Sequence, residues 1–213
     1  MANVTTHPSG FADQAVLLEG TPGSYEVCRF RSCDDAPVSP EAVRSLVQDG
    51  FLSLNQLLGS REDMTDDEFS ADWTDVDTIK FIASDHGVAL GFLTVMVGLN
   101  RVNWVPRATI ETYLHEVGQL GVPFYIGTLV VQPSAHHGVA HELLRGALQS
   151  FDEWNARSAE QSAAFFDCVG RNALTLPRTV QIIASTNPGS ISVHQVAQLQ
   201  EGEHERLIFA VHK

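Results

Sequence analysis

The sequence predicts one mixed-sheet α/β domain, and three observations support this fold class. The chain has 213 residues, which is enough for one well-packed core and short for two. Its hydrophobic fraction of 44% and charged fraction of 18% are those of an ordinary globular protein. Two β-prone runs are each followed by a stretch with helical periodicity. We therefore expect a domain over residues 24–213, preceded by a flexible arm over residues 1–23 with at most one short strand.

The first half of the domain is expected to hold a strand, one or two helices and a hairpin. Alternating residues predict a strand over 25–33. Ser39 and Pro40 form a helix start, and apolar residues keep helical spacing after it, with Gly50 as a point where the helix can divide. The β-prone runs 78–83 and 88–97 flank a turn sequence and predict a β-hairpin.

The second half is expected to contain two strand-then-helix units. An inserted helix over 110–117 precedes an apolar run, Phe124–Val131, which predicts a strand buried on both faces. A long amphipathic helix is expected from Val139. The second unit is predicted as a strand over 179–185 and a helix over 190–199, with a last strand over 206–211. Between the units, a short helix over 163–168 and a loop over 171–177 are expected.

The chain is strongly acidic, with 13 Lys and Arg against 26 Asp and Glu and a net charge of -13. A surface of this sign repels phosphate backbones and anionic membranes and attracts cations. We therefore expect no nucleic acid and no membrane as partner, but a cationic small molecule or a basic peptide; a homodimer is left open. Eight acidic residues lie within 62–77, which we interpret as a solvated face, with a cation-attracting rim as the alternative.

Cysteine usage and the first residues bear on location. Cys28, Cys33 and Cys168 lack CxxC spacing, which favours free thiols in a reducing compartment. Residues 1–14 show no basic segment followed by an apolar run, and the apolar stretch over 88–99 is interrupted by glycines. The sequence therefore predicts a cytoplasmic protein.

A short turn over residues 132–140 joins the expected buried strand to the long helix. A glycine-containing turn that opens a helix leaves backbone N–H groups pointing outward, and the helix dipole adds partial positive charge. Such a place can hold a pyrophosphate, although this signal is weak when it stands alone.

Strand, turn and helix together resemble the acyl-CoA signature of the GNAT acyltransferases. The segment LVVQP over 129–133 is similar to the family's hydrophobic strand and V-x-P, and Gly138 and Ala140 take the two small positions before a leucine pair. The loop is one residue shorter than the family's. Ala135 stands where the family has a basic residue or Gln, with His136 as the nearest substitute.

This resemblance implies a GNAT-like sheet, mostly antiparallel with one splayed parallel strand pair and flanked by helices. It implies acetyl-CoA, or another acyl-CoA, as co-substrate. The residues that it assigns to the cofactor here are Leu129, Val130, Val131, His136, His137, Gly138, Val139 and Ala140.

Residues 182–191, IIASTNPGSI, resemble the family's later strand as it enters an N-x-x-[AS]-I helix. The resemblance assigns Asn187 and Ser190 to the cofactor, with Asn187 on the pantetheine arm. In the family, a Tyr seven residues after the Asn protonates the leaving thiolate, and that position holds His194, the predicted catalytic residue. With a reference pKa of ~6.5, an imidazole also suits a base. A turn role for Asn187 and a plain helix position for His194 stay open.

Other candidate residues are judged from their surroundings. Glu111 and Tyr113, on the inserted helix, are candidates for holding the cationic amine, with a core position as the alternative for Tyr113. His137 and His141 are four residues apart, but only His141 falls inside the expected helix, so no metal site is predicted. No motif places a His or Asp beside Cys168, so a thiol enzyme is not predicted.

The sequence thus predicts an N-acyltransferase that moves an acetyl or other acyl group from acyl-CoA to a primary amine. One alternative is a GNAT-fold protein that has lost catalysis and serves as a ligand sensor or partner-binding module. Another is an acyltransferase that uses acyl carrier protein, which would need a basic docking patch. The net charge of -13 disfavours that alternative.

Overall fold

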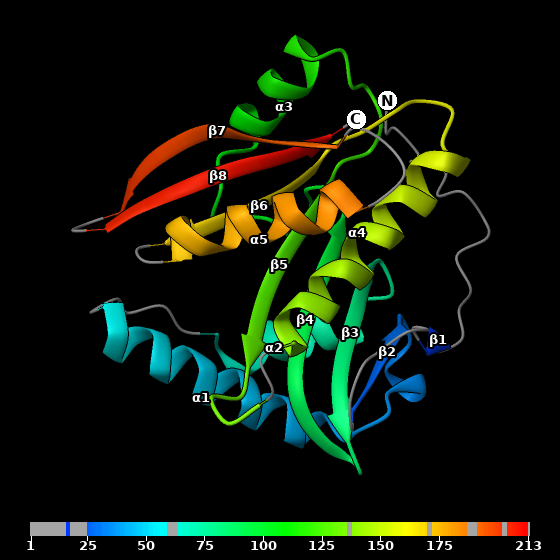
Figure 1. Ribbon diagram of the computed structural model, residues 1–213, viewed down its shortest axis with the longest axis vertical. Helices are drawn as coiled ribbons and strands as arrows, with labels where there is room; N and C mark the ends of the chain where they lie inside the picture. Colours follow the sequence, from blue (N-terminus) through cyan, green and yellow to red (C-terminus); the bar gives the residue numbers. More distant parts are fainter. Residues whose placement is uncertain are drawn as a thin grey trace.

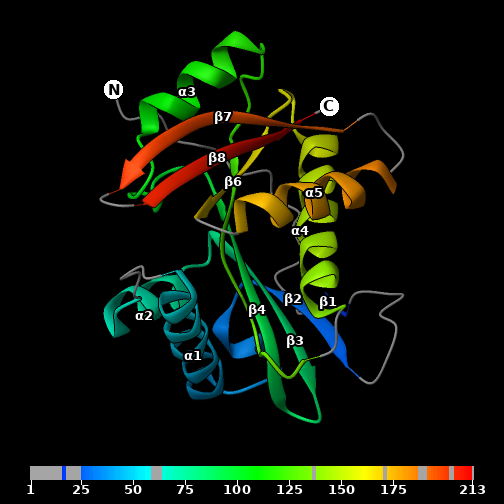
Figure 2. The same ribbon diagram turned by 60° about the vertical axis from the view of Figure 1, so that its left-hand side comes forward.

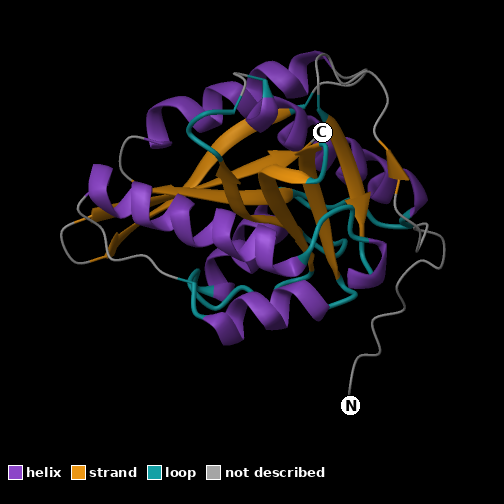
Figure 3. Cartoon of the chain, turned by 90° about the horizontal axis from the view of Figure 1, so that it is seen from below, coloured by secondary structure: helices purple, strands orange, loops and turns teal. Residues whose placement is uncertain are grey.

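An eight-stranded sheet with helices on both faces forms the protein (Figures 1 and 3). The computed structural model describes residues 16–17, 25–58, 64–135, 138–169, 172–186, 191–201 and 204–212. The strand order is β1-β2-β3-β4-β5-β6-β8-β7, and every neighbouring pair is antiparallel except β5 and β6. The predicted fold class is therefore confirmed.

The elements alternate along the chain as follows. The strands are β1 (Val16–Leu17), β2 (Glu26–Phe30), β3 (Thr78–Asp85), β4 (Val88–Val97), β5 (Phe124–Val131), β6 (Ala164–Val169), β7 (Ser192–Glu201) and β8 (His204–His212). The helices are α1 (Pro40–Leu58), α2 (Asp66–Thr74), α3 (Arg107–Glu116), α4 (Val139–Arg157) and α5 (Asn172–Thr186), with a 3₁₀ turn at Cys33–Asp35. The strand within the N-terminal segment is thus present as β1.

The helix α1 is continuous over 19 residues, so the expected division at Gly50 is wrong. A Cβ at Gly50 would lie 2.7 Å from Cγ1 of Val130. Glycine costs a helix interior about 1 kcal/mol relative to alanine. At this position glycine lets α1 lie directly against the end of β5. This close contact explains why a glycine stands in the middle of the helix.

The acidic run over 62–77 contains a helix, α2, whose first-turn carboxylates Asp66, Asp67 and Glu68 are exposed, as expected of a solvated face. Thr65 and Glu68 form a capping box at its start, in which each side chain accepts from the other residue's backbone N–H. Phe69 and Trp73 are buried on its inner face. The hairpin of β3 and β4 is confirmed, and its turn uses two left-handed residues, His86 and Gly87, at φ 47° and 82°.

The secondary structure predicted between residues 160 and 200 is wrong, whereas the last predicted strand, over 206–211, is confirmed as β8. The expected short helix over 163–168 is β6, the expected loop and strand over 171–185 lie in α5, and the expected helix over 190–199 is β7. In α5, Leu176, Val180 and Ile183 share one inner face at helical spacing, and Pro177 inside the helix disguised that pattern. A short apolar run such as β6 cannot be classified by periodicity alone.

The sheet has a core on each face. On one face, α4 and α5 pack on β3–β6 and β8, with Phe124, Phe151 and Phe166 in the cluster. On the other face, α1 and α2 cover β2–β4, and α3 covers the far end of the sheet around Tyr125 and Phe165. Figure 2 shows α4 and α5 on the opposite side from α1 and α2.

A β-bulge in β5 separates it from β6. Leu93 pairs with Leu129 whereas Val95 pairs with Ile126, so β5 carries one extra residue at Gly127–Thr128. The Thr128 N–H donates to the side-chain hydroxyl of fully buried Thr94 at 3.0 Å. Bulges bend the strand that contains them.

Because β5 bends, its parallel pairing with β6 covers only residues 124–126. The two strands diverge beyond that point (Figure 1). The second half of β5 is accordingly half-buried, not buried on both faces as the apolar run had predicted.

A buried lysine joins the end of β2, the end of α2 and the start of β3 by hydrogen bonds. The Nζ of Lys80, on β3, donates to the backbone carbonyls of Arg31, Asp75 and Thr78 at 2.7, 2.6 and 3.2 Å. Its side chain is fully buried, and burial lowers the pKa of Lys80 to about 8. At neutral pH the ammonium group is therefore charged and donates all three hydrogen bonds, which join β2 and the end of α2 to the sheet.

We predict a pH-dependent stability difference between the wild type and Lys80→Met. Between pH 8 and pH 10.5, the lysine of the unfolded chain still holds its proton while the folded one has lost it. The unfolded state binds more protons there, so the contribution of Lys80 to the free energy of unfolding rises with pH. In urea unfolding, the free energy of unfolding of the wild type minus that of the variant should increase by about 2 kcal/mol from pH 7 to pH 9.5. A constant difference would contradict the prediction.

Candidate functional site

The diverging strands leave one edge of β5 without a partner strand in the described sheet. The Gln132 N–H donates to the Leu90 carbonyl of β4 at 2.9 Å, and the Thr128 N–H also points to β4. Because successive residues of a strand point their backbone groups in opposite directions, those of Leu129 and Val131 face the gap toward β6. The side chains of Leu129 and Val131 pack toward α4, and that of Val130 packs toward α1. These three predicted cofactor residues thus lie together at the gap.

The first turn of α4 lies beside the end of β5. Gly138 is its N-cap and has no side-chain capping hydrogen bond, while Val139 is fully buried and Ala140 is half-buried. The first N–H groups of a helix have no partner within it and carry partial positive charge. Three of the predicted cofactor residues therefore form an uncapped helix start that can bind an anion.

A glycine on β4 sets the position of this helix start. A Cβ at Gly91 would lie 2.7 Å from Cγ1 of Val139 and 2.9 Å from Cδ1 of Leu143. Both partners are fully buried, so neither has free space to enter. Gly91 therefore lets α4 sit directly on β4, next to the register position of Val131.

Charged side chains of the first two turns of α4 pair with one another. Glu142 is 7% exposed, and its carboxylate accepts from Nε of Arg145 at 2.7 Å. The Nδ1 atom of His141 lies 3.3 Å from the same carboxylate. The negative charge of Glu142 is therefore compensated inside the cluster. No group of three or more His, Cys, Asp or Glu suited to a metal ion occurs among the described residues.

A polar network lies on β6 just beyond its pairing with β5. The Asp167 carboxylate accepts from the Tyr125 hydroxyl, from Nε1 of Trp104 at 3.2 Å and from the Arg206 guanidinium. Burial raises the pKa of Tyr125 far above its usual value, and the Asp167 charge adds to this, so the phenol stays protonated. Because its oxygens already accept three hydrogen bonds, Asp167 is a structural carboxylate on the wall of the gap. No sequence pattern had singled it out.

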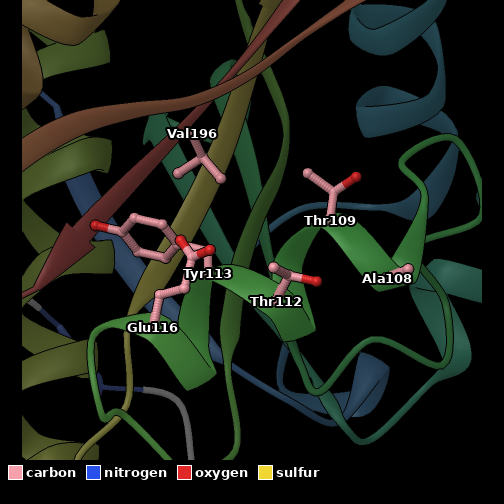
Figure 4. A pocket seen from close by; sticks show the side chains of 6 residues that line it. All are labelled: Ala108, Thr109, Thr112, Tyr113, Glu116 and Val196. Carbon is pink, nitrogen blue, oxygen red and sulfur yellow. The ribbon is translucent and has the colours of Figure 1, made fainter.

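The two predicted amine-binding residues differ in their surroundings. Glu111 is exposed and pairs with Arg107 one turn earlier, at 2.6 Å. The Tyr113 ring contacts Phe165 and His212 edge to face. These contacts agree in part with the alternative that Tyr113 is a core residue. A groove of about 400 Å³ between α3 and β7 is lined by Ala108, Thr109, Thr112, Tyr113, Glu116 and Val196 (Figure 4). Its acidic side chain is Glu116, not Glu111, and none of its lining residues comes from β5 or β6.

The structure places His194 on β7, so its predicted position in a helix is wrong. The imidazole is exposed, lies 2.8 Å from the Ser192 hydroxyl and stacks on His212 with ring centroids 5.2 Å apart. The register runs from His194 through β8 and β6 to Tyr125, so three strand spacings, roughly 14 Å, separate it from β5. The match of His194 to the family's tyrosine assumed a helix at this position, so the structure does not support it.

The strand and helix that follow β5 and α4 are in fact β6 and α5. The Asn that opens a helix there is Asn172, the first residue of α5, although Thr175 and Leu176 stand where the pattern has [AS] and I. The position seven residues later is Thr179, whose hydroxyl donates to the Thr175 carbonyl at 3.1 Å. The signal that could have found this unit is the run AFFDCV followed by Asn172. No phenol occupies the position of the family's proton donor.

Four predicted cofactor residues, His136, His137, Asn187 and Ser190, lie outside the described residues. Cys28, Cys33 and Cys168 are all free thiols. Burial, with a smaller contribution from the Asp167 charge, raises the pKa of Cys168 to about 12, which agrees with a buried thiol and not a nucleophile. None of the helices within the described ranges is long and apolar enough to cross a membrane.

A mostly antiparallel sheet with one splayed parallel pair, and an uncapped helix beside the splay, define the fold of the GNAT acyltransferases. No protein-family model matches the sequence, and no curated protein matches it in sequence. Solved structures do match, and the likeness extends over most of the chain. At the low identities found, it shows the fold alone.

One similar structure is an N-acyl amino acid synthase from uncultured soil microbes, with a TM-score of 0.58 and 10% identity over 93% of this chain and 89% of that one. An acetyltransferase of the GNAT family from Streptococcus agalactiae gives 0.53 and 10% over 82% and 90%. The diaminobutyrate acetyltransferase of Paenibacillus lautus, in complex with its substrate and coenzyme A, gives 0.52 and 14% over 89% and 96%.

We predict that Gly91→Ala lowers stability by about 1–3 kcal/mol and also displaces the start of α4, because the new methyl group overlaps Val139 and Leu143. Gly118→Ala is the matched control. Gly118 has φ 70° and nothing within 4 Å of its Cβ position, so alanine there costs about 1 kcal/mol of backbone strain without moving α4. Thermal unfolding measures both losses. Amide exchange at the start of α4 should rise only in Gly91→Ala, and equal exchange in both variants would contradict the prediction.

Proposed function

We propose that this protein transfers an acyl group from acyl-CoA, most simply acetyl-CoA, to the primary amine of a cationic small molecule or peptide. The observation that carries the proposal is the open edge of β5 at Leu129 and Val131, which lies beside the uncapped start of α4. An extended amide-containing chain can pair with a free strand edge, and a pyrophosphate can bind at a helix N-terminus. The strand edge would bind the amide-containing arm of CoA, and the helix start would bind its pyrophosphate.

The residues present fit this co-substrate. Gly138 places no side chain at the start of α4, where a Cβ would lie 3.0 Å from the Tyr25 hydroxyl oxygen. The backbone N–H and C=O groups of Leu129 and Val131 offer donors and acceptors along the gap. Bound acyl-CoA would supply a thioester whose carbonyl carbon the amine attacks, and the CoA thiolate would leave. A backbone N–H of β5 that donates to the thioester carbonyl would stabilise the negative charge that develops on its oxygen.

An acceptor that carries positive charge is supported by the net charge of -13. The acidic first turn of α2, with Asp66, Asp67 and Glu68, adds to the negative potential on the α1 and α2 side of the sheet. The similar diaminobutyrate acetyltransferase acts on a molecule with primary amines. The attacking amine must be neutral, so it must lose a proton before reaction. A cytoplasmic location is also proposed, because free thiols are usual in reducing compartments.

A second candidate function is a GNAT-fold ligand sensor or partner-binding module without catalysis. The observation that favours it is Thr179, which cannot donate a proton to a thiolate as a phenol can, since a hydroxyl of this kind does not titrate in water. Ala135 likewise offers no charge to a phosphate group. Ligand binding without turnover would support this candidate.

Calorimetry with acetyl-CoA tests the CoA site, and Gly138→Asp is the decisive variant. The aspartate carboxylate would lie at the positive end of the helix dipole, where it competes with a phosphate group and repels it. We expect acetyl-CoA affinity to fall at least tenfold, while thermal unfolding shows that the variant stays folded. Gly138→Ala controls for the added bulk next to Tyr25 and should lose less affinity. Failure of the wild type to bind acetyl-CoA or longer acyl-CoAs at millimolar concentration would refute both candidate functions.

Thiol release in the presence of a panel of amines separates enzyme from sensor. We expect the wild type to release CoA with a cationic primary amine. His194→Ala should retain activity within about threefold, because the imidazole is exposed on β7 and roughly 14 Å from β5. A loss of turnover by two orders of magnitude with unchanged acetyl-CoA binding would restore His194 as the catalytic residue. Binding without release for every amine would favour the sensor.

A further inference from the structure

Tyr25, immediately before β2, has a buried hydroxyl without a hydrogen-bond partner among the described residues. The residue is 4% exposed, and its ring belongs to the core between the sheet and α4. Buried tyrosine hydroxyls usually find a partner, because an unpaired buried polar group costs about 1–3 kcal/mol. The orphaned group therefore calls for a functional explanation.

The hydroxyl of Tyr25 lies at the start of α4. A Cβ placed on Gly138, the N-cap residue, would be 3.0 Å from Tyr25 Oη. The side chain of an N-cap residue is the group that normally reaches the free N–H groups of the first turn. Tyr25 Oη therefore lies next to the first atom of such a side chain, at the start of α4.

The charges around Tyr25 keep it a hydrogen-bond donor. Burial raises the pKa of the phenol above 10.0, and the Glu142 carboxylate raises it further, while Arg145 acts in the opposite direction. The group is thus protonated throughout the neutral range. The Glu142 carboxylate accepts from Arg145, and no hydrogen bond from the phenol to Glu142 is formed.

We propose that the Tyr25 hydroxyl donates a hydrogen bond to a phosphate oxygen of the acyl-CoA pyrophosphate when that group binds at the start of α4. This inference rests on the proposed function. It assigns a binding role to Tyr25, which lies more than a hundred positions before the turn over residues 132–140. It also names a neutral donor in a site where Ala135 replaces a basic residue or Gln. An orphaned phenol in the free protein would then gain its partner only on binding.

The test compares Tyr25→Phe with the wild type, using CoA and pantetheine as calorimetric ligands. A hydrogen bond to a charged group is strong, so we expect CoA affinity to fall about tenfold. Pantetheine has the same arm but no phosphate, and its affinity should not change. In the free protein the melting temperature should stay the same or rise, because the substitution removes an unpaired polar group.

Tyr125→Phe is the matched control, because the Tyr125 hydroxyl already donates to Asp167 on the other face of the sheet. This variant should lose stability without a preferential loss of CoA over pantetheine. The inference is overturned if Tyr25→Phe binds CoA as the wild type does, or if it loses CoA and pantetheine equally. A wild type that binds no CoA overturns the proposed function and the inference together, whereas a wild type that binds CoA leaves Tyr25→Phe to test the inference alone.

Discussion

The hydrogen bond from the Thr128 N–H to the Thr94 hydroxyl is the interaction on which the gap depends. The extra residue at Gly127–Thr128 takes a backbone N–H out of its ladder, and a buried N–H without a partner is costly. The hydroxyl of Thr94 supplies that partner from inside the sheet. A Cβ at Gly127 would lie 2.8 Å from the same oxygen, so glycine is required beside it. The bend of β5, its separation from β6 and the free edge at Leu129 and Val131 all follow from this local arrangement.

Two glycines bring the layers to the same strand end from opposite faces. Gly50 lets α1 approach Val130, and Gly91 lets α4 approach through Val139. Each contact is too close for a side chain, so each fixes a helix axis near the sheet. The end of β5 that borders the gap is thus held between two closely packed helices. A ligand that entered there would meet a preformed edge, which lowers the entropy cost of binding.

The sequence predicted the sheet class, the hairpin, β5 and α4, because their local signals agree with their tertiary roles. The bulge was not predicted, although an isolated glycine within a strand, such as Gly127, often marks one. The unit of β6 and α5 was misassigned for a physical reason: β6 is buried on both faces, and Pro177 lies inside α5. That error carried His194 onto the wrong element. Tyr25 and Asp167 were missed because their contacts with Gly138, and with Tyr125 and Trp104, join residues more than forty positions apart in the sequence.

The bulge also has a consequence for how the length of β5 can change. Phe124 and Ile126 point to the α4 face, and beyond the extra residue it is the odd-numbered Leu129 and Val131 that do so. Removal of one residue between Ile126 and Leu129 would leave two steps on β5 opposite the two steps from Val95 to Leu93 on β4, so the ladder would become regular. Leu129 and Val131 would still face α4, and the two cores would keep their residues. What such a deletion would remove is the bend of β5, so the gap can be lost without any change in the packing of the helices.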